Sequence, residues 1–280
     1  MPDPGVHREH AYAKLTRNLR VLGRALGGLH ALEAEMITLD LCDDLEITPR
    51  SGSASEVEVV DEVRWRGFKD SLGGSPVVVP ADGTNLVARA LVAVGRSAAV
   101  RLTKRIPAGG GLGGGSADAG AVLRWAGVTE VAVASSLGSD VPFCVAGGRA
   151  LVSGAGEAVE PMPFELVHVV LVTPRFGVST AAVYGRWDDI GGPRSESGND
   201  LAPAALLVDP RLEWWRSFLA SVAGRDPVLA GSGSTWFFEC GSAAAAVALA
   251  DQIAVGVGDA GTRAFVHACR SIPSATVSAD

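Results

Sequence analysis

The feature of the sequence best suited to chemistry is a run of glycines near the middle of the chain. Six of the seven residues from Gly109 to Gly115 are glycine, interrupted by Leu112, and the run lies between Pro107 and Ser116. Glycine adopts positive φ angles and lets a ligand approach the backbone with no Cβ in the way. Where such a loop opens a helix, the free amides of the first turn and the positive end of the helix dipole attract an anion. A phosphate group is therefore the ligand we expect.

The segments on either side of this run are those that would position a phosphate. Residues 100–106 have the apolar, branched composition of a strand. Apolar residues then recur at helical spacing from Ala117 to Trp125, so the order is strand, glycine loop, helix. A flexible linker or a tight turn is the alternative for any glycine run, but linkers do not usually separate a strand from a helix. Neither the Gly-x-x-x-x-Gly-Lys motif nor the dinucleotide-binding motif matches, so we interpret the run as a third kind of phosphate loop.

The rest of the chain shows further strand and helix patterns. Asn85 lies at the start of a helical pattern over residues 84–95. Strand patterns cover residues 36–41, 45–48 and 167–173, and helical patterns cover residues 201–207, 212–219 and 243–253. A weaker boundary lies at residues 161–165. We therefore expect one domain over residues 1–160 and a second over residues 161–280.

Composition excludes several classes of protein. The 280 residues are 48% apolar, and charges interrupt every apolar stretch before it reaches the roughly 20 residues of a membrane span. The first ten residues are polar, unlike a secretory signal, so we expect a cytoplasmic protein. A net charge of −7 and a pI near 5.3 argue against a nucleic-acid surface. The four cysteines lie far apart and are expected to be reduced, mostly buried thiols: Cys42, Cys144, Cys240 and Cys269.

The segment PAGGGLGGGSADA resembles the second sequence motif of the GHMP kinases. Its form GLGGGSADA is specific to the branch of that family that acts on a diphosphocytidyl alcohol. The resemblance covers nearly the whole chain and includes AYAKLTRNLRVLG, GGLHALEAEMITLDLCDDLEI, NLVARAL, LGSDVPFCVAGGRALVSGAGE, GVSTAAVYGRWD, GND and AGSGSTWFFE. It implies an α+β, two-domain GHMP kinase fold, with the active site in the cleft between the halves.

For the reaction, the resemblance implies that Asp140 is the catalytic aspartate and that Lys14 orients it together with the acceptor hydroxyl. Phosphoryl transfer to an alcohol needs an aligned hydroxyl, neutralised phosphate charge and an acceptor for the proton, so a carboxylate beside a cation suits it. Taken alone, the aspartate is more typical of a turn or helix cap, and the lysine of a solvated charge. The implied ATP-binding residues are Asn85, Lys104, Pro107, Gly109, Gly110, Gly111, Leu112, Gly113, Gly114, Gly115 and Ser116.

On the substrate side, the resemblance implies that His30 contacts the cytosine of a cytidine diphosphate group and that Tyr184 stacks on the base. A histidine offers a donor and an acceptor nitrogen, and an aromatic ring offers a flat face. A turn-capping histidine and a packed core tyrosine are the alternatives. The other implied substrate-binding residues are Thr16 and, in the third GHMP motif, Gly231, Ser232 and Gly233.

The expected activity is phosphorylation, by ATP with Mg²⁺, of the 2-hydroxyl of 4-diphosphocytidyl-2-C-methyl-D-erythritol, a step of non-mevalonate isoprenoid synthesis. The partner is then a small molecule carrying cytidine diphosphate, with no nucleic acid or membrane, and the chain is a monomer or homodimer. No Mg²⁺ ligands are assigned. A GHMP kinase for another small alcohol and a non-catalytic nucleotide-binding paralogue are the alternatives. Three departures bear on the substrate: Thr16 replaces the common asparagine, Leu29 replaces the usual tyrosine, and residues 126–137 are a short segment for the family.

Overall fold

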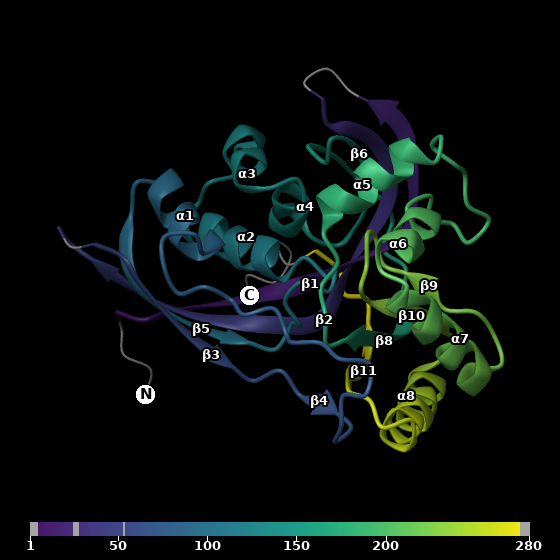
Figure 1. The fold of residues 1–280 in the computed structure, drawn as a ribbon. Helices are drawn as coiled ribbons and strands as arrows, with labels where there is room; N and C mark the ends of the chain where they lie inside the picture. The colour runs from purple at the N-terminus through teal and green to yellow at the C-terminus, as the bar shows by residue number, and fades with distance from the viewer. Residues whose placement is uncertain (1–4, 25–27, 53, 275–280) are drawn as a thin grey trace.

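Two long antiparallel strands, β1 (His7–Arg24) and β2 (His30–Arg50), run through the whole molecule in the computed structural model, which describes residues 5–24, 28–52 and 54–274 (Figure 1). They belong to a sheet with the order β3-β5-β2-β6-β7, in which β1 pairs with β2. The other strands of this sheet are β3 (Glu56–Asp61), β5 (Ser97–Lys104), β6 (Arg149–Gly154) and β7 (Ala158–Pro161).

A second sheet has the order β4-β11-β8-β10-β9, with every neighbouring pair antiparallel. Its strands are β4 (Trp65–Arg66), β8 (His168–Pro174), β9 (Val228–Leu229), β10 (Trp236–Cys240) and β11 (Ala264–Arg270). Strand β4 comes from the N-terminal half of the sequence, and Ile272 returns to the first sheet by donating its amide to Thr38 O over 2.9 Å. The chain therefore passes between the two sheets more than once. The domain boundary near residue 160 stays a prediction.

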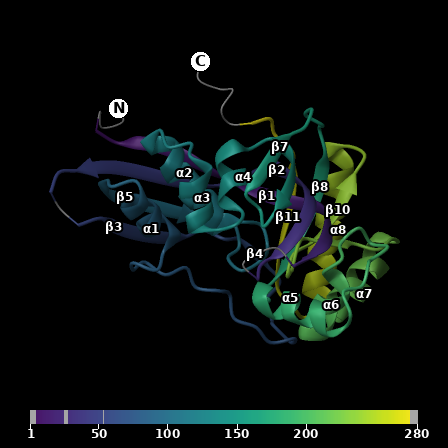
Figure 2. The ribbon, with the colours of Figure 1, turned by 90° about the horizontal axis from the view of Figure 1, so that it is seen from above.

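Helices cover one face of the first sheet and pack around the second (Figures 1 and 2). The first group is α1 (Leu86–Ala93), α2 (Gly114–Ala126), α3 (Val131–Leu137) and α4 (Val141–Ala146). The second group is α5 (Thr180–Asp189), α6 (Ala202–Val208), α7 (Arg211–Ala223) and α8 (Ala243–Asp259). Side-chain caps fix several starts: Asn85 accepts the amide of Val87, and Ser242 accepts that of Ala245.

Strand β2 differs from the sequence prediction, which gave two short strands over residues 36–41 and 45–48. The structure has one continuous strand, and the polar residues between the two apolar runs do not interrupt it. Cys42 and Asp44 face outward, whereas Asp43 is fully buried and ion-paired with a lysine. The sequence prediction placed a break between the two apolar runs. It was wrong because the polar segment there contains a buried carboxylate with a charged partner, which lies within the strand.

The long strands contribute to two apolar cores. Ala34, Met36 and Leu45 join the core that includes α1 and α2, whereas Ile37 and Leu39 join a second core that includes residues of β8 and β10. Side chains alternate along a strand, so successive residues of β2 enter different cores. The β1–β2 register also shifts between Tyr12 and Lys14 and again between Thr16 and Asn18. Both sheets are thereby built on the same pair of strands.

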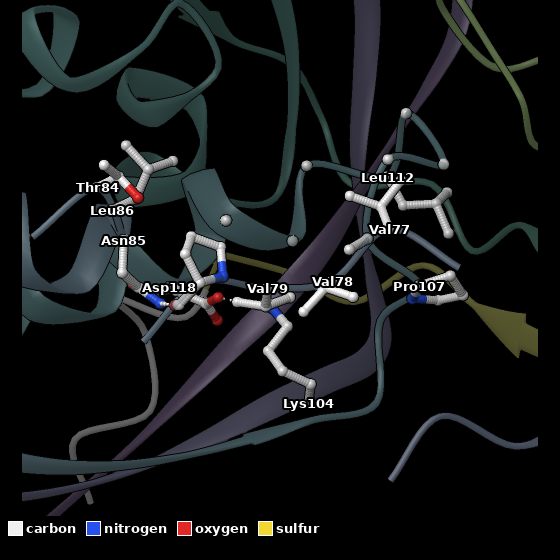
Figure 3. A pocket seen from close by; sticks show the side chains of 18 residues that line it. Val77, Val78, Val79, Thr84, Asn85, Leu86, Lys104, Pro107, Leu112 and Asp118 are labelled. Atoms are coloured by element: carbon white, nitrogen blue, oxygen red, sulfur yellow. Dashed lines mark hydrogen bonds and ion pairs between the residues drawn. The ribbon is translucent and has the colours of Figure 1, made fainter. Parts of the chain in front are cut away.

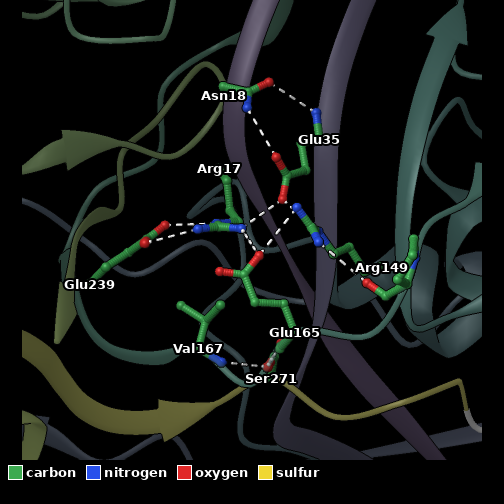
Figure 4. Close-up of polar contacts among 9 residues, drawn as sticks. Arg17, Asn18, Glu35, Arg149, Glu165, Val167, Glu239 and Ser271 are labelled. Atoms are coloured by element: carbon green, nitrogen blue, oxygen red, sulfur yellow. Dashed lines mark hydrogen bonds and ion pairs between the residues drawn. The ribbon is translucent and has the colours of Figure 1, made fainter. Parts of the chain in front are cut away.

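A cluster of charged side chains joins the two sheets (Figure 4). Arg17 of β1 donates to both oxygens of Glu239 on β10, over 2.7 and 2.9 Å, and to Glu35 of β2 over 2.6 Å. Arg149 of β6 donates to Glu35 over 2.8 Å, and both arginines reach Glu165 at 3.1 Å. Since several charges share each partner, the cluster fixes the relative position of four strands better than an isolated surface pair would.

Asp200 fastens the segment before α6 to strand β1. Its fully buried carboxylate accepts the amides of Val21 and Ser195 over 3.1 and 2.9 Å, and it pairs with Arg20 and Arg194 at 2.9 and 2.7 Å. Burial acts to raise the pKa of Asp200, but these hydrogen bonds outweigh it and lower the pKa below its ordinary value. The ionised form therefore stabilises the fold.

We predict that Asp200→Asn lowers the free energy of unfolding at neutral pH by about 3 kcal/mol, because two arginines lose their buried partner. A carboxyl whose pKa is lowered by folding contributes fully above the unfolded value near ~3.9 and loses its contribution as pH falls through the lower folded value. The gap between wild type and variant should thus be constant at neutral pH and shrink below about pH 4. Urea denaturation across this range measures it. Asp189→Asn, at a side chain that is 68% exposed, is the control; a gap that persists unchanged in acid would contradict the assignment.

Candidate active site

The glycine loop joins β5 to α2 in the predicted order of strand, loop and helix. Three of its glycines have positive φ: 72° at Gly109, 80° at Gly111 and 69° at Gly113. Gly113 is the N-cap of α2, and in the described structure no side chain caps this end of the helix. The first-turn amides of α2 are thus left for a ligand, which is the arrangement that binds phosphate groups elsewhere.

A second glycine-containing loop, residues 230–234, packs directly against the first. Thr235 N donates to Gly110 O over 3.1 Å. A Cβ placed on Gly111 would lie 2.8 Å from the backbone oxygen of Gly233 and 2.9 Å from that of Ala230, so only glycine fits. Ser232 Oγ lies 2.9 Å from Thr180 Oγ1 at the start of α5. The structure therefore brings Gly231, Ser232 and Gly233 beside the glycine loop.

Asn199 holds this second loop in place. Its side chain is buried and donates to the backbone oxygens of Leu229 and Gly231 over 2.8 and 2.7 Å, while its Oδ1 accepts the amide of Leu201. With all its polar atoms engaged by the protein, the asparagine of the Gly-Asn-Asp segment acts as a support for the loop.

A cavity of about 240 Å³ opens along the glycine loop (Figure 3). Its lining includes nearly all the predicted ATP-binding residues: Asn85, Lys104, Pro107, Gly109, Gly110, Gly111, Leu112, Gly113, Gly114 and Gly115. Ser116 is not part of this lining; its hydroxyl points toward Gly138, near the start of α4. The facing wall comes from Val77, Val78, Val79 and Pro80, which the sequence had not assigned to the site. Four successive apolar residues after a Gly/Ser-rich stretch were the signal available for this wall.

Two of the lining residues use their polar groups on the protein itself. Asn85 caps α1 and donates to Pro80 O over 2.6 Å, which fixes the valine wall. Lys104 lies below the loop, buried between Asp43 and Asp118, and its ammonium is 2.6 Å from Asp118 Oδ2. Burial raises the pKa of Asp118 to about 7 although Lys104 acts in the opposite direction. The other carboxylate oxygen of Asp118, Oδ1, has no hydrogen-bond partner among the described residues.

Lys14 and Asp140 face one another beside the glycine loop. Lys14 Nζ lies 3.3 Å from Asp140 Oδ2 and 3.2 Å from Thr16 Oγ1, and the lysine side chain is only 6% exposed. Asp140 heads α4, yet its carboxylate makes no capping bond within the described structure. The amide of Lys14 donates to Leu112 O over 3.0 Å, which ties β1 to the loop. The geometry thus excludes the solvated lysine and the helix-capping aspartate.

His30 and Tyr184 also lie together, with their rings stacked on one another. The ring centroids are 4.7 Å apart at an interplanar angle of 24°, and Trp187 meets His30 edge-on at 5.8 Å. Asp188, on the same helix as Tyr184, accepts from His30 Nε2 over 2.9 Å, and Arg24 contacts its other oxygen. Burial and then the charge of Asp140 raise the pKa of Tyr184 to about 12. Leu29 is 64% exposed and takes no part in the stack.

Comparison with known proteins identifies the family of this chain. No protein-family model matches the chain. A 4-diphosphocytidyl-2-C-methyl-D-erythritol kinase from Paracoccus denitrificans is 34% identical over 266 residues, which cover 88% of this chain and 92% of that protein. The same kinase from Nocardia farcinica is 33% identical, with 99% of this chain and 97% of that protein covered. The chain belongs to this family of kinases.

Solved structures extend the comparison. A crystal structure of 4-(cytidine 5'-diphospho)-2C-methyl-D-erythritol kinase matches with a TM-score of 0.71 and 28% identity, covering 95% of this chain and all of that one. A mevalonate kinase structure shares the fold at a TM-score of 0.56 and 12% identity. The predicted family, the mixed α and β fold of the GHMP kinases and the small-molecule kinase class are therefore confirmed. Within the described residues, no helix is long and apolar enough to cross a membrane.

The contact between the glycine loop and Lys14 gives a sharp prediction. An ideal Cβ on Gly113 would lie 2.7 Å from Lys14 Cγ, and Gly113 has a positive φ of 69°. Gly127 at the other end of α2 has nearly the same φ, 71°, but no described heavy atom lies within 4 Å of its Cβ position. We expect Gly113→Ala to reduce turnover at least tenfold, roughly the effect of misplacing a catalytic group by about an ångström. Gly127→Ala carries the same backbone strain and should keep near wild-type turnover. Equal losses in two folded variants would show that strain alone is responsible.

Proposed function

We propose that this chain transfers the γ-phosphoryl group of ATP to the 2-hydroxyl of 4-diphosphocytidyl-2-C-methyl-D-erythritol. The observation that carries the proposal is the Lys14–Asp140 pair, 3.3 Å apart, whose lysine lies against the glycine loop at Leu112 and Gly113. The loop beside this pair offers a phosphate site, and the His30–Tyr184 stack offers an aromatic surface for a base. A phosphoryl donor and a nucleotide-bearing alcohol can therefore meet at the carboxylate.

Asp140 accepts the proton of the acceptor hydroxyl as phosphoryl transfer proceeds. Its oxygens are free of capping bonds in the described structure, and the ammonium of Lys14 fixes the carboxylate on one side. Thr16 accepts from the same ammonium, so the hydroxyl that replaces the common asparagine still holds Lys14 in position. The amides at the start of α2 hold the phosphates, which is the larger part of catalysis in phosphoryl transfer.

The residues near the loop also fit a magnesium ion bound with the nucleotide. Mg²⁺ prefers oxygen ligands and keeps several waters. The unpartnered Oδ1 of Asp118 in the cavity lining is such an oxygen. Mg²⁺ would neutralise phosphate charge that Lys104 cannot, since two carboxylates already surround that lysine.

The Asp188 contact supports a preference for cytosine. A carboxylate only accepts hydrogen bonds, so Nε2 of His30 is the donor, and in the neutral ring the lone pair lies on Nδ1. An acceptor nitrogen matches the exocyclic amino group of cytosine and opposes the carbonyl that uracil carries at the same place. We propose that the base packs against the His30–Tyr184 stack and is recognised in this way.

For Asp140→Asn, we expect kcat to fall by about 10²-fold or more, because a general base contributes about that much. The dissociation constant for ATP should change less than about threefold, since the carboxylate acts mainly in the transition state. Steady-state kinetics and calorimetry measure the two. Glu130→Gln is the control, because Glu130 heads the neighbouring helix α3 and also makes no capping bond in the described structure. A variant that keeps more than about a tenth of wild-type kcat would remove Asp140 from this role.

Specificity is tested by kcat/KM for the diphosphocytidyl alcohol, its diphosphouridyl analogue and free methylerythritol phosphate. Wild type should prefer the cytidine compound by at least about tenfold. A substrate that carries uracil, or no base, leaves the polar atoms of His30 without a hydrogen-bond partner. His30→Ala should abolish the preference, and Asp188→Asn should weaken it while kcat for the best substrate changes little. Equal values in wild type would favour a GHMP kinase for another alcohol. Absence of turnover with every alcohol would favour a non-catalytic paralogue.

A further inference from the structure

Three side chains of different chemistry gather on the outward face of strands β1 and β2, apart from the active site. His10 and Asp44 are cross-strand partners, and Cys42 lies two residues before Asp44 on β2. Because side chains alternate along a strand, Cys42 and Asp44 share the face opposite to buried Asp43. Imidazole, thiol and carboxylate are therefore brought together by rigid strands, at a place that the kinase reaction does not use.

The distances between their potential ligand atoms are close to those between the ligand atoms of a metal centre. His10 Nδ1 lies 2.8 Å from Asp44 Oδ1 and 3.9 Å from Cys42 Sγ, and the three atoms are all within 4.8 Å of one another. Tetrahedral zinc, with bonds of about 2.0–2.3 Å, sets its ligand atoms roughly 3.3–3.7 Å apart. Side-chain rotations that open the His10–Asp44 pair by about half an ångström and close the other two pairs by up to about 1.3 Å would reach that geometry. The His10 side chain is 58% exposed and that of Asp44 34%, so an ion can enter from solvent.

Neighbouring contacts hold these ligands in place. Arg105 binds Asp44 through Oδ2, which leaves Oδ1 for the cluster, and Arg105 also pairs with Glu62 at 3.3 Å. Arg124 donates to the backbone oxygen of His10 over 2.7 Å. Such outer contacts orient ligands in known metal sites and are worth about 10- to 100-fold in affinity. Zinc binds cysteine as the thiolate, so metal binding would release the proton of the Cys42 thiol.

We propose that His10, Cys42 and Asp44 form a zinc-binding site with one position left for water or a further ligand. Thiolate and imidazole ligands select zinc and similar transition metals over magnesium, which prefers oxygen alone. The site is therefore separate, in position and in metal preference, from the Mg²⁺ that accompanies ATP. Within the described residues, no other group of three histidine, cysteine or acidic side chains has this spacing.

The test titrates the metal-free full chain with Co²⁺ and with Zn²⁺ in the presence of excess Mg²⁺. One Co²⁺ per chain should bind and give the near-ultraviolet charge-transfer absorption of a cobalt–thiolate bond. Zn²⁺ should displace the Co²⁺, and Mg²⁺ should not. Calorimetry with Zn²⁺ then gives the affinity.

Two variants and a control complete the design. Cys42→Ser should remove the thiolate absorption and weaken Zn²⁺ binding at least tenfold, and His10→Gln, at an exposed side chain, should weaken it similarly without harm to folding. Cys240→Ser changes a partly buried thiol outside the cluster and should match wild type. Binding without the thiolate band, equal affinity in the Cys42 and Cys240 variants, or displacement by Mg²⁺ would each overturn the proposal.

Discussion

Three stretches of backbone meet at the glycine loop, and at Gly111 their contact is too close for any residue larger than glycine. Leu112 O receives the amide of Lys14 from β1, Gly110 O receives that of Thr235, and Gly111 lies against the oxygens of residues 230 and 233. The loop is thus fixed from both sheets before any ligand arrives. If these amides bind phosphate as we propose, they need no rearrangement, so their attraction for the transferred group is available throughout the reaction.

A buried cluster of charged side chains lies below the glycine loop. Lys104 is buried between Asp43 and Asp118, and Asp43 also accepts the amides of the two residues after Lys104. A buried ion pair contributes little net stability, but removal of one partner is costly, so the triad serves mainly to hold the start of the loop in one position. The lysine that would serve as a direct phosphate ligand in another kinase here supports the loop from beneath.

The sequence was most informative where local pattern and site coincide. The strand, glycine loop and helix could be predicted because each has its own local signature, and the family motifs located Lys14 and Asp140. Apart from the Lys14–Asp140 pair, which the resemblance implied, contacts made across long sequence separations could not be predicted. These include the pairing of His30 with Asp188, the valine wall fixed by Asn85 and the pairing of Asp43 with Lys104, which explains why a polar interruption in β2 is strand and not loop.

Two register shifts between β1 and β2 flank the residues of β1 that reach the site. Between them, Ala13 and Leu15 point into an apolar core, while Lys14 and Thr16 point to the site on the other face. Since side chains alternate strictly, one residue inserted or deleted here would exchange the two sets, burying the lysine in the core and exposing leucine at the reaction centre. The length of this short segment is thus more tightly constrained than the identity of most of its residues. In a set of related chains, gaps should fall in the surface loops and leave this part of β1 ungapped.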